Sequence, residues 1–120
     1  MSEQQVTVTT ENQDGVVVAH VAGEIDLASA PRLSRELTAA IPNDATGVVI
    51  DLSGTTYLDS SGVSLVFELA ERMQARQQQL RLALPDGAPL RRVLRVVNLE
   101  SVVPIATTVE AAAADIKKVE

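Results

Sequence analysis

Residues 48–63 read VVIDLSGTTYLDSSGV, and the organisation of the whole chain follows from this stretch. Its first five residues, 48–52, are almost continuously apolar, which is typical of a central strand covered on both faces. Residues 53–59 follow as a loop. From Ser60 the sequence predicts a long helix that ends near Arg76, because apolar side chains recur at helical spacing. The stretch therefore indicates a strand, a loop and a helix of an α/β domain. The apolar face of the helix comprises Val63, Val66, Phe67, Ala70 and Met73, widened by Leu65 and Leu69.

The residues before this stretch predict a β-hairpin and a helix. Residues 6–10 (VTVTT) alternate with the period of two that a half-buried strand shows, and residues 16–22 (VVVAHVA) form a second strand. Between them, Asp14-Gly15 favours the positive φ angles of a tight turn. After residues 23–26 (GEID), Ser29 can cap a helix. The apolar positions of that helix are Ala30, Leu33, Leu37, Ala40 and Ile41.

The residues after the long helix continue the alternation. Residues 80–84 (LRLAL) form the next strand, and Asp86 and Pro89 open a third helix. Residues 102–105 form a short strand that Pro104 restricts to a sheet edge or a strand end. Residues 109–118 form a last, alanine-rich helix. The inward positions predicted for the third helix are Leu90, Val93, Leu94 and Val97.

These elements define the fold class. The predicted order is strand, strand and helix, followed by three more pairs of a strand and a helix. We expect a single α/β domain over residues 1–120, with an N-terminal β-hairpin, alternating strands and helices, and a mixed sheet. The later strands are expected to be parallel, with right-handed crossovers. A chain of 120 residues suits one domain that buries its own core.

Composition excludes several classes of function. The formal net charge of −6 disfavours binding to nucleic acid and to anionic membrane surfaces. One Tyr, one Phe and no Trp leave few aromatic faces for base stacking. No cysteine is present for disulfides, thiolate catalysis or cysteine-ligated zinc, and we expect no cofactor and no metal. Without a long apolar run or an apolar N-terminus, the chain is expected to be a soluble, cytoplasmic domain.

The loop that leads into the long helix is the first candidate site. In open α/β sheets, functional residues gather at the carboxyl ends of the strands, where loops enter helices. The loop ends in Asp59-Ser60-Ser61-Gly62, and the N-terminus of a helix stabilises a phosphate group. A phosphoserine at this point would leave the fold intact. The polar arc of the helix comprises Ser60, Ser61, Ser64, Glu68, Glu71 and Ala75, and this strip could face a partner.

A purely structural explanation accounts for the same residues. Asp, Ser and Gly are ordinary at the start of a helix, and either Asp59 or Ser60 could serve as the N-cap. Physical chemistry alone favours this explanation over a functional site.

A family resemblance adds to these observations. Residues 48–63 resemble the signature of the STAS-domain anti-anti-sigma factors, in which an apolar strand and a loop precede Asp-Ser-Ser/Thr-Gly and an apolar helix. Residues 23–26 (GEID) are similar to the Gly-Glu-Leu-Asp of that family. Residues 94–99 and 102–105 fit the family as well, so that the resemblance covers nearly the whole chain in order.

The resemblance implies a partner-switching mechanism and no enzymatic activity. In that family an anti-sigma factor, which is also a serine kinase, binds the unmodified protein and releases a sigma factor. The kinase then phosphorylates the first serine after the aspartate, which corresponds to Ser60, and a metal-dependent phosphatase of the PP2C type resets the switch. The residues implied in partner binding are Asp26, Asp59, Ser61, Gly62, Ser64 and Glu68.

Two of these residues carry specific expectations. Gly62 would allow the backbone of a partner to come close. Ser64 stands where the family often has Gly or Ala, and it would either narrow the choice of partner or offer an alternative phosphoacceptor.

Three other functions are considered. A response-regulator receiver could use Asp51, but the acidic pair and the lysine that a receiver needs are absent. A hydrolase could use Ser60 or Ser61, but there is no Gly-x-Ser-x-Gly motif, and the single histidine, His20, is expected to be a packed or surface residue of a strand. A stressosome-like STAS scaffold or a STAS subunit of a lipid-transport complex would keep the fold and bind partners without releasing a sigma factor. The arginines 91, 92 and 95 are expected to form a solvated face.

Overall fold

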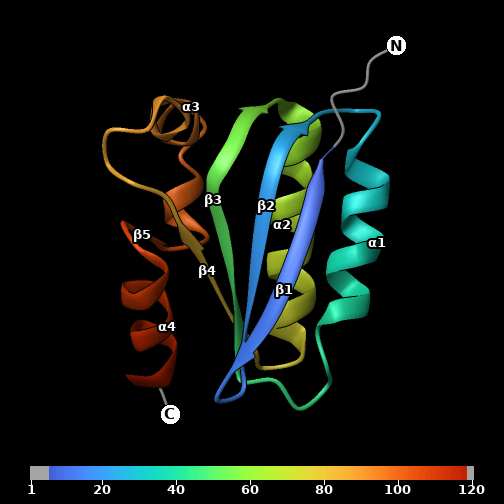
Figure 1. The fold of residues 1–120 in the computed structure, drawn as a ribbon, viewed down its shortest axis with the longest axis vertical. Helices are drawn as coiled ribbons and strands as arrows, with labels where there is room; N and C mark the ends of the chain where they lie inside the picture. The colour runs from blue at the N-terminus through green and yellow to red at the C-terminus, as the bar shows by residue number, and fades with distance from the viewer. Residues whose placement is uncertain (1–5, 119–120) are drawn as a thin grey trace.

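The computed structural model describes residues 6–118, and residues 1–5, which include the polar N-terminus, and 119–120 lie outside the described part. The strands are β1 (Thr7–Gln13), β2 (Val16–Ile25), β3 (Gly47–Leu58), β4 (Gln79–Ala83) and β5 (Ile105–Ala106). The helices are α1 (Ala30–Ala40), α2 (Ser60–Ala75), α3 (Pro89–Val96) and α4 (Val109–Lys118), with a 3₁₀ turn η1 at Leu99–Ser101. This order confirms the α/β organisation expected from the sequence (Figure 1).

One mixed sheet organises the domain. Its strands lie in the order β1-β2-β3-β4-β5, with β1 antiparallel to β2 and the other neighbours parallel. The hairpin between β1 and β2 turns at Asp14 and Gly15, whose φ angles are 57° and 88°. The side chain of Asn12 accepts a hydrogen bond from the Gly15 N–H at 2.9 Å. The expected hairpin and its Asp-Gly turn are therefore confirmed.

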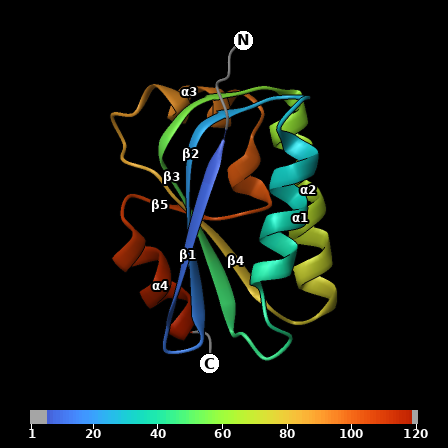
Figure 2. The ribbon, with the colours of Figure 1, turned by 45° about the vertical axis from the view of Figure 1, so that its right-hand side comes forward.

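Helices cover the two faces of the sheet unequally. The larger core packs α1, α2 and α3 against one face, around buried residues such as Leu33, Ile50 and Leu82. On the other face α4 is the one helix in the described part of the chain, and it packs Ala112, Ala113 and Ile116 against a small valine-rich patch. Figure 2 shows α4 on the side of the sheet opposite α1 and α2. Because α4 is only 10 residues long, it leaves part of this face without a helix.

Strand β3 is longer than the sequence predicts. Residues 53–58, expected to lie in a loop, continue the strand and pair with the end of β2, which itself extends to Ile25. The buried hydroxyl of Thr55 donates a hydrogen bond to the carbonyl oxygen of Val21 at 2.8 Å. This extension carries the strand to the residue immediately before Asp59, and it fixes where α2 begins.

Two details of the C-terminal half also differ from expectation. Leu90 and Leu94 of α3 are buried as predicted, whereas Val93 and the C-cap residue Val97 are each 39% exposed, because this short helix buries only a narrow stripe. The strand expected at 102–105 is β5, which has two residues and begins after Pro104. The carbonyl oxygen of Pro104 nevertheless accepts a hydrogen bond from the Leu82 N–H at 3.0 Å.

No helix among residues 6–118 is long and apolar enough to cross a membrane.

Candidate functional site

The parallel pairing of β2 and β3 brings two aspartates to the same edge of the sheet. Ile25 and Leu58, the last residues of the two strands, are register partners. The backbone N–H of Asp59 donates to the carbonyl oxygen of Ile25 at 3.2 Å. Asp26 and Asp59 therefore leave the sheet from adjacent positions, and the two loops predicted as parts of one site do begin side by side.

Asp59 is the N-cap of α2. Its backbone is extended, with φ −105° and ψ −166°, and its Oδ1 accepts hydrogen bonds from the N–H groups of Ser61 at 2.8 Å and Gly62 at 3.4 Å. Of the two caps considered from the sequence, Asp59 fills the role, because its carboxylate satisfies N–H groups that the helix itself leaves unpaired. Ser60 is the first residue of the helix and is exposed. Its hydroxyl is not consumed by capping.

Asp26 organises the loop between β2 and α1. Its Oδ1 accepts hydrogen bonds from the N–H groups of Ala28 and Ser29, both at 3.0 Å. The Ser29 hydroxyl donates to the carbonyl oxygen of Glu24 at 2.8 Å and accepts from the Asp26 N–H at 3.0 Å. The hydrogen bond from the Ser29 backbone is the main cause of the lowered pKa of the Asp26 carboxyl. Asp26 is therefore held as an anion in a rigid turn.

The expectation that Ser29 caps α1 needs correction. Ser29 occupies the N-cap position, but its side chain makes no hydrogen bond to the helix. The hydroxyl points back into the loop and fixes the Asp26 turn instead. The first turn of α1 carries Pro31, which lacks an N–H group and so leaves one donor fewer to satisfy.

Gly62 has a different reason for being glycine than the sequence suggested. The residue is buried, and a Cβ atom added to it would lie 2.7 Å from Leu58 Cγ and 3.0 Å from Ile25 Cγ2. The absent side chain thus makes room for the ends of β2 and β3, not for the backbone of a partner. Gly62 supports the site from inside by letting α2 start directly against the sheet.

A surface groove runs between α1 and α2 beside Ser60. Three residues expected in partner binding, Ser61, Ser64 and Glu68, line one side of it. Asp26 and Asp59, which follow the last residues of β2 and β3, do not line it. The remaining lining residues are Leu27, Ala30, Pro31, Ser34 and Leu65.

Leu27 is a surface residue that the sequence interpretation missed. It stands at the apex of the Asp26 turn with 76% of its surface exposed, although leucine is usually buried. Its position in the sequence is the available sign of this exposure, because Leu27 lies before the series of buried apolar residues that starts at Ala30. An apolar side chain presented on a rigid turn, in the same groove as Ser61 and Ser64, is suited to contact with another protein.

Among residues 6–118, no group of three or more His, Asp or Glu side chains is arranged to hold a metal ion. Asp51, considered as a receiver phosphoacceptor, forms an ion pair with His20 at 2.7 Å and accepts a hydrogen bond from the Ser53 N–H at 3.0 Å. Its location on the face of the sheet that carries α4 separates it from Ser60.

The fold and the site define a class of protein. Residues 7–112 match the family model of the STAS domain. The structure superimposes on the crystal structure of an anti-sigma factor antagonist from Mycobacterium paratuberculosis with a TM-score of 0.85 and 27% identity, and it covers 97% of both chains. The unphosphorylated form of the antagonist SpoIIAA, 24% identical, matches with a TM-score of 0.74 over 93% of this chain and 97% of its own, which shows a shared fold.

Proteins similar in sequence indicate the family within the STAS-domain proteins. The chain is 34% identical over 110 residues to the putative anti-sigma factor antagonist BtrV of Bordetella bronchiseptica, a match that covers 91% of this chain and 93% of the relative. It is 29% identical to the anti-sigma-F factor antagonist RsfB of Mycobacterium tuberculosis, over 79% of this chain and 76% of the relative. The chain belongs to the anti-sigma factor antagonist family of STAS-domain proteins. Members of this family are regulators and not enzymes, which confirms the non-enzymatic role expected from the sequence.

Proposed function

We propose that this chain is a partner switch operated by phosphorylation of Ser60. In the unphosphorylated form it binds an anti-sigma factor that is also a serine kinase, and a sigma factor is thereby released. Phosphorylation of Ser60 ends the complex, and a metal-dependent phosphatase of the PP2C type restores the binding form. The observation that carries the proposal is the exposed hydroxyl of Ser60 at the start of α2, with Asp59 serving as the cap in its place.

Because of the location of Ser60, a phosphate on this residue would affect partner binding without disrupting the fold. A phosphate at the first residue of α2 meets the partial positive charge of the helix N-terminus, and the free protein therefore tolerates it. The same phosphate adds a charge of about −1.5 to −2 to a surface that already carries Asp26, Asp59 and Glu68. A partner that packs closely on this surface meets a desolvation cost and, where it is acidic, direct repulsion.

The proposed contact surface extends from the strand ends down α2. Asp26 and Asp59 form its upper end, and Ser61, Ser64 and Glu68 continue it along the groove between α1 and α2. Gly62 contributes indirectly, through its packing beneath the helix. Ser64 lies one helical turn after Ser60 and is exposed, and we propose that it either narrows the choice of partner or acts as an alternative acceptor.

The experiment that tests this function is mass spectrometry of the protein purified from its own host, before and after phosphatase treatment. One phosphoryl group mapped to Ser60 is the expected result. Modification at Ser64 alone would still support a phosphorylation switch, but with Ser64 in place of Ser60 as the phosphorylated residue. Absence of phosphorylation under every growth condition would contradict the proposal and favour a constitutive STAS scaffold or transport subunit.

A pair of variants tests the charge mechanism. Ser60→Ala should bind the kinase and remain bound when ATP is added, whereas Ser60→Asp should bind weakly from the start. The stability of Ser60→Asp should equal that of the wild type or exceed it by about 0.3–1 kcal/mol, because the new carboxylate lies at a helix N-terminus. Equal affinity of the two variants for the kinase would exclude the charge mechanism.

A further inference from the structure

A second polar cluster lies on the face of the sheet that α4 only partly covers. Where α4 packs, the strands present Val16, Val18 and Val49. Further along the same face, toward the carboxyl ends of the parallel strands, the corresponding positions are His20 on β2 and Asp51 on β3. These two residues are direct register partners. The side chains on this face change from valine to ionisable residues at the point where α4 no longer covers the sheet.

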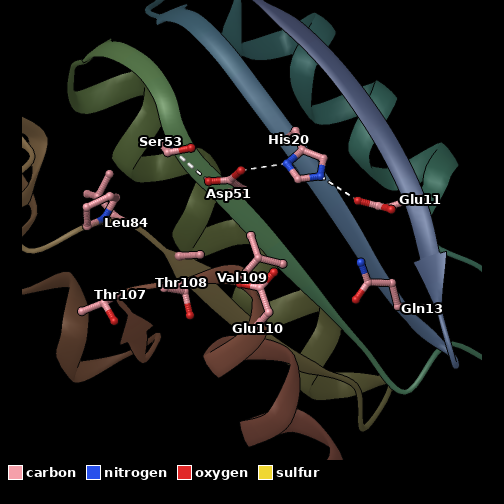
Figure 3. Close-up of a pocket in the computed structure, with 12 residues that line it drawn as sticks. Glu11, Gln13, His20, Asp51, Ser53, Leu84, Thr107, Thr108, Val109 and Glu110 are labelled. Atoms are coloured by element: carbon pink, nitrogen blue, oxygen red, sulfur yellow. Dashed lines mark hydrogen bonds and ion pairs between the residues drawn. The ribbon is translucent and has the colours of Figure 1, made fainter.

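His20 joins three strands through its two ring nitrogens. Nδ1 lies 2.7 Å from Asp51 Oδ2 on β3, and Nε2 lies 2.9 Å from Glu11 Oε2 on β1. Figure 3 shows the imidazole between the two carboxylates, with both interactions drawn. The side chain of Asp51 is only 14% exposed, whereas those of His20 and Glu11 are 39% and 52% exposed. The interaction with Asp51 is therefore shorter and better shielded than the interaction with Glu11.

The geometry sets the protonation state of the ring. A carboxylate can only accept a hydrogen bond, so both ring nitrogens must carry a proton for both interactions to form. Such a ring is an imidazolium between two anions, and the bonds to Glu11 and then Asp51 raise the pKa of His20 above its ordinary value of 6.5. A neutral imidazole has a single N–H group and keeps one of the two bonds.

We propose that Glu11, His20 and Asp51 form a proton-operated clasp. When both ring nitrogens of His20 carry a proton, the clasp ties the edge strand β1 to β3. When one proton is lost, His20 releases Glu11, and with it β1. The retained proton is the one on Nδ1, because the bond to Asp51 is shorter and more buried. The bare Nε2 lone pair then faces the Glu11 carboxylate, and this contact becomes repulsive. The strand that loosens is β1, which within residues 6–118 pairs with β2 alone.

The other groups that face His20 bear on the titration. Glu110 of α4 lines the same hollow and is the acidic residue that this helix brings to it. From β1, Gln13 is neutral, and from β3, Ser53 contacts the clasp through Asp51. Residues 83–85, which begin at the last residue of β4, and residues 107–109, which end at the first residue of α4, bring no charge into the hollow.

The pH range of the closed clasp follows from the directions of the shifts. The pKa of His20 is raised, so its contribution to stability is complete below 6.5 and is lost as the pH rises through the higher value in the folded protein. The hydrogen bond from His20 lowers the pKa of Glu11 below 4.5. Burial raises the pKa of Asp51, but the bonds from Ser53 and His20 bring it below 3.8. The carboxylate contributions are therefore present above these values and are lost in acid.

The test uses the tag-free chain, in which His20 is the only histidine and gives one set of ring signals. Ring ¹H–¹⁵N correlation spectra across the titration should show a pKa above 6.5 and, at high pH, a proton on Nδ1. Hydrogen exchange, normalised to the intrinsic rates, should show that the protection of β1 amides falls about two- to fivefold across the same titration. The amides of β4 should show no such step.

Glu11→Gln is the variant that isolates the clasp. It replaces the exposed anion, leaves β1 and β2 with the same backbone pairing, and should abolish the pH step in β1 protection while lowering the pKa of His20. Thr10→Gln, on the same strand and without contact to the ring, is the matched control and should retain the step. A proton on Nε2 at high pH, an unchanged β1 protection, or an equal step in Glu11→Gln would each overturn the proposal.

Discussion

The backbone N–H of Asp59 donates a hydrogen bond to the carbonyl oxygen of Ile25, and this contact ties the start of one loop of the candidate site to the end of β2, where the other loop begins. It continues the parallel pairing of β2 and β3 one residue past the last register pair, Ile25 and Leu58. The start of α2 is thus attached to the sheet, and the surface that surrounds Ser60 is set before any partner binds. Preorganisation of this kind reduces the entropy lost on binding.

Replacing the cap should destabilise the fold. Asp59→Ala removes the acceptor for the N–H groups of Ser61 and Gly62, and we expect a loss of about 1 kcal/mol in the free energy of unfolding. Urea denaturation measures the change. Ser60→Ala is the control and should stay within about 0.5 kcal/mol of the wild type. An equal effect of both substitutions would show that Asp59 is not the cap that matters.

Adding one methyl group at Gly62 should be costly. Gly62→Ala places a Cβ atom 2.7 Å from Leu58 Cγ, and the buried neighbours have little room to move. We expect a destabilisation of about 1–3 kcal/mol, measured by thermal or urea unfolding. Gly87→Ala is the matched control, because a Cβ atom at that position meets nothing within 4 Å. A tolerated Gly62→Ala would mean that α2 can shift away from the sheet without loss.

Gln78 should be essential to stability although it lies far from Ser60. The residue is 6% exposed, and its Nε2 donates to the carbonyl oxygens of Pro42 and Ala45, each at 3.0 Å. Gln78→Ala leaves these carbonyls without that donor, and we expect a loss of about 1–3 kcal/mol. The exposed Gln74→Ala is the comparison and should change the free energy of unfolding by less than about 0.5 kcal/mol.

Leu27 should matter for binding and not for folding. Because the side chain is 76% exposed, Leu27→Ser should leave the unfolding midpoint nearly unchanged. Its affinity for the proposed partner, an anti-sigma factor with kinase activity, should fall about tenfold or more, as expected when an apolar anchor is lost. Isothermal titration calorimetry gives the affinity. Val96→Ser, at an equally exposed valine of α3, is the control, and the same loss in both variants would argue against a specific role for Leu27.

Most elements follow from local patterns in the sequence. The β1–β2 turn is predictable because Asp14 and Gly15 adopt the positive φ angles that this dipeptide favours. The long helix is predictable because its buried residues recur at helical spacing. The end of β3 is not predictable in the same way. The pairing of β2 with β3 shifts register between His20 and Ala22 and again between Gly23 and Glu24. These irregularities break the period of two, and residues 53–58 consequently resemble a loop.

The site is also only partly predictable, because some of its features are local in sequence and others depend on tertiary contacts. Asp59 and Ser60 occupy a helix start that the sequence marks clearly, and the family resemblance points to the same residues. The inward role of Gly62 depends on how Leu58 and Ile25 meet, which is a tertiary contact. The pairing of His20 with Asp51 depends on strand register. The sequence predicts His20 as a packed or surface residue of a strand, and it gives no sign of either carboxylate.

The two-residue length of β5 has a consequence for how this protein behaves in crowded solution. An open sheet edge can recruit a strand from another chain and start aggregation, and native proteins protect their edges against this. Here one edge is too short to template a strand, and Pro104 stands immediately before it. At the opposite edge β1 is polar along most of its length and includes the charged Glu11. Both edges of the sheet thus carry features that disfavour the addition of a strand from another chain.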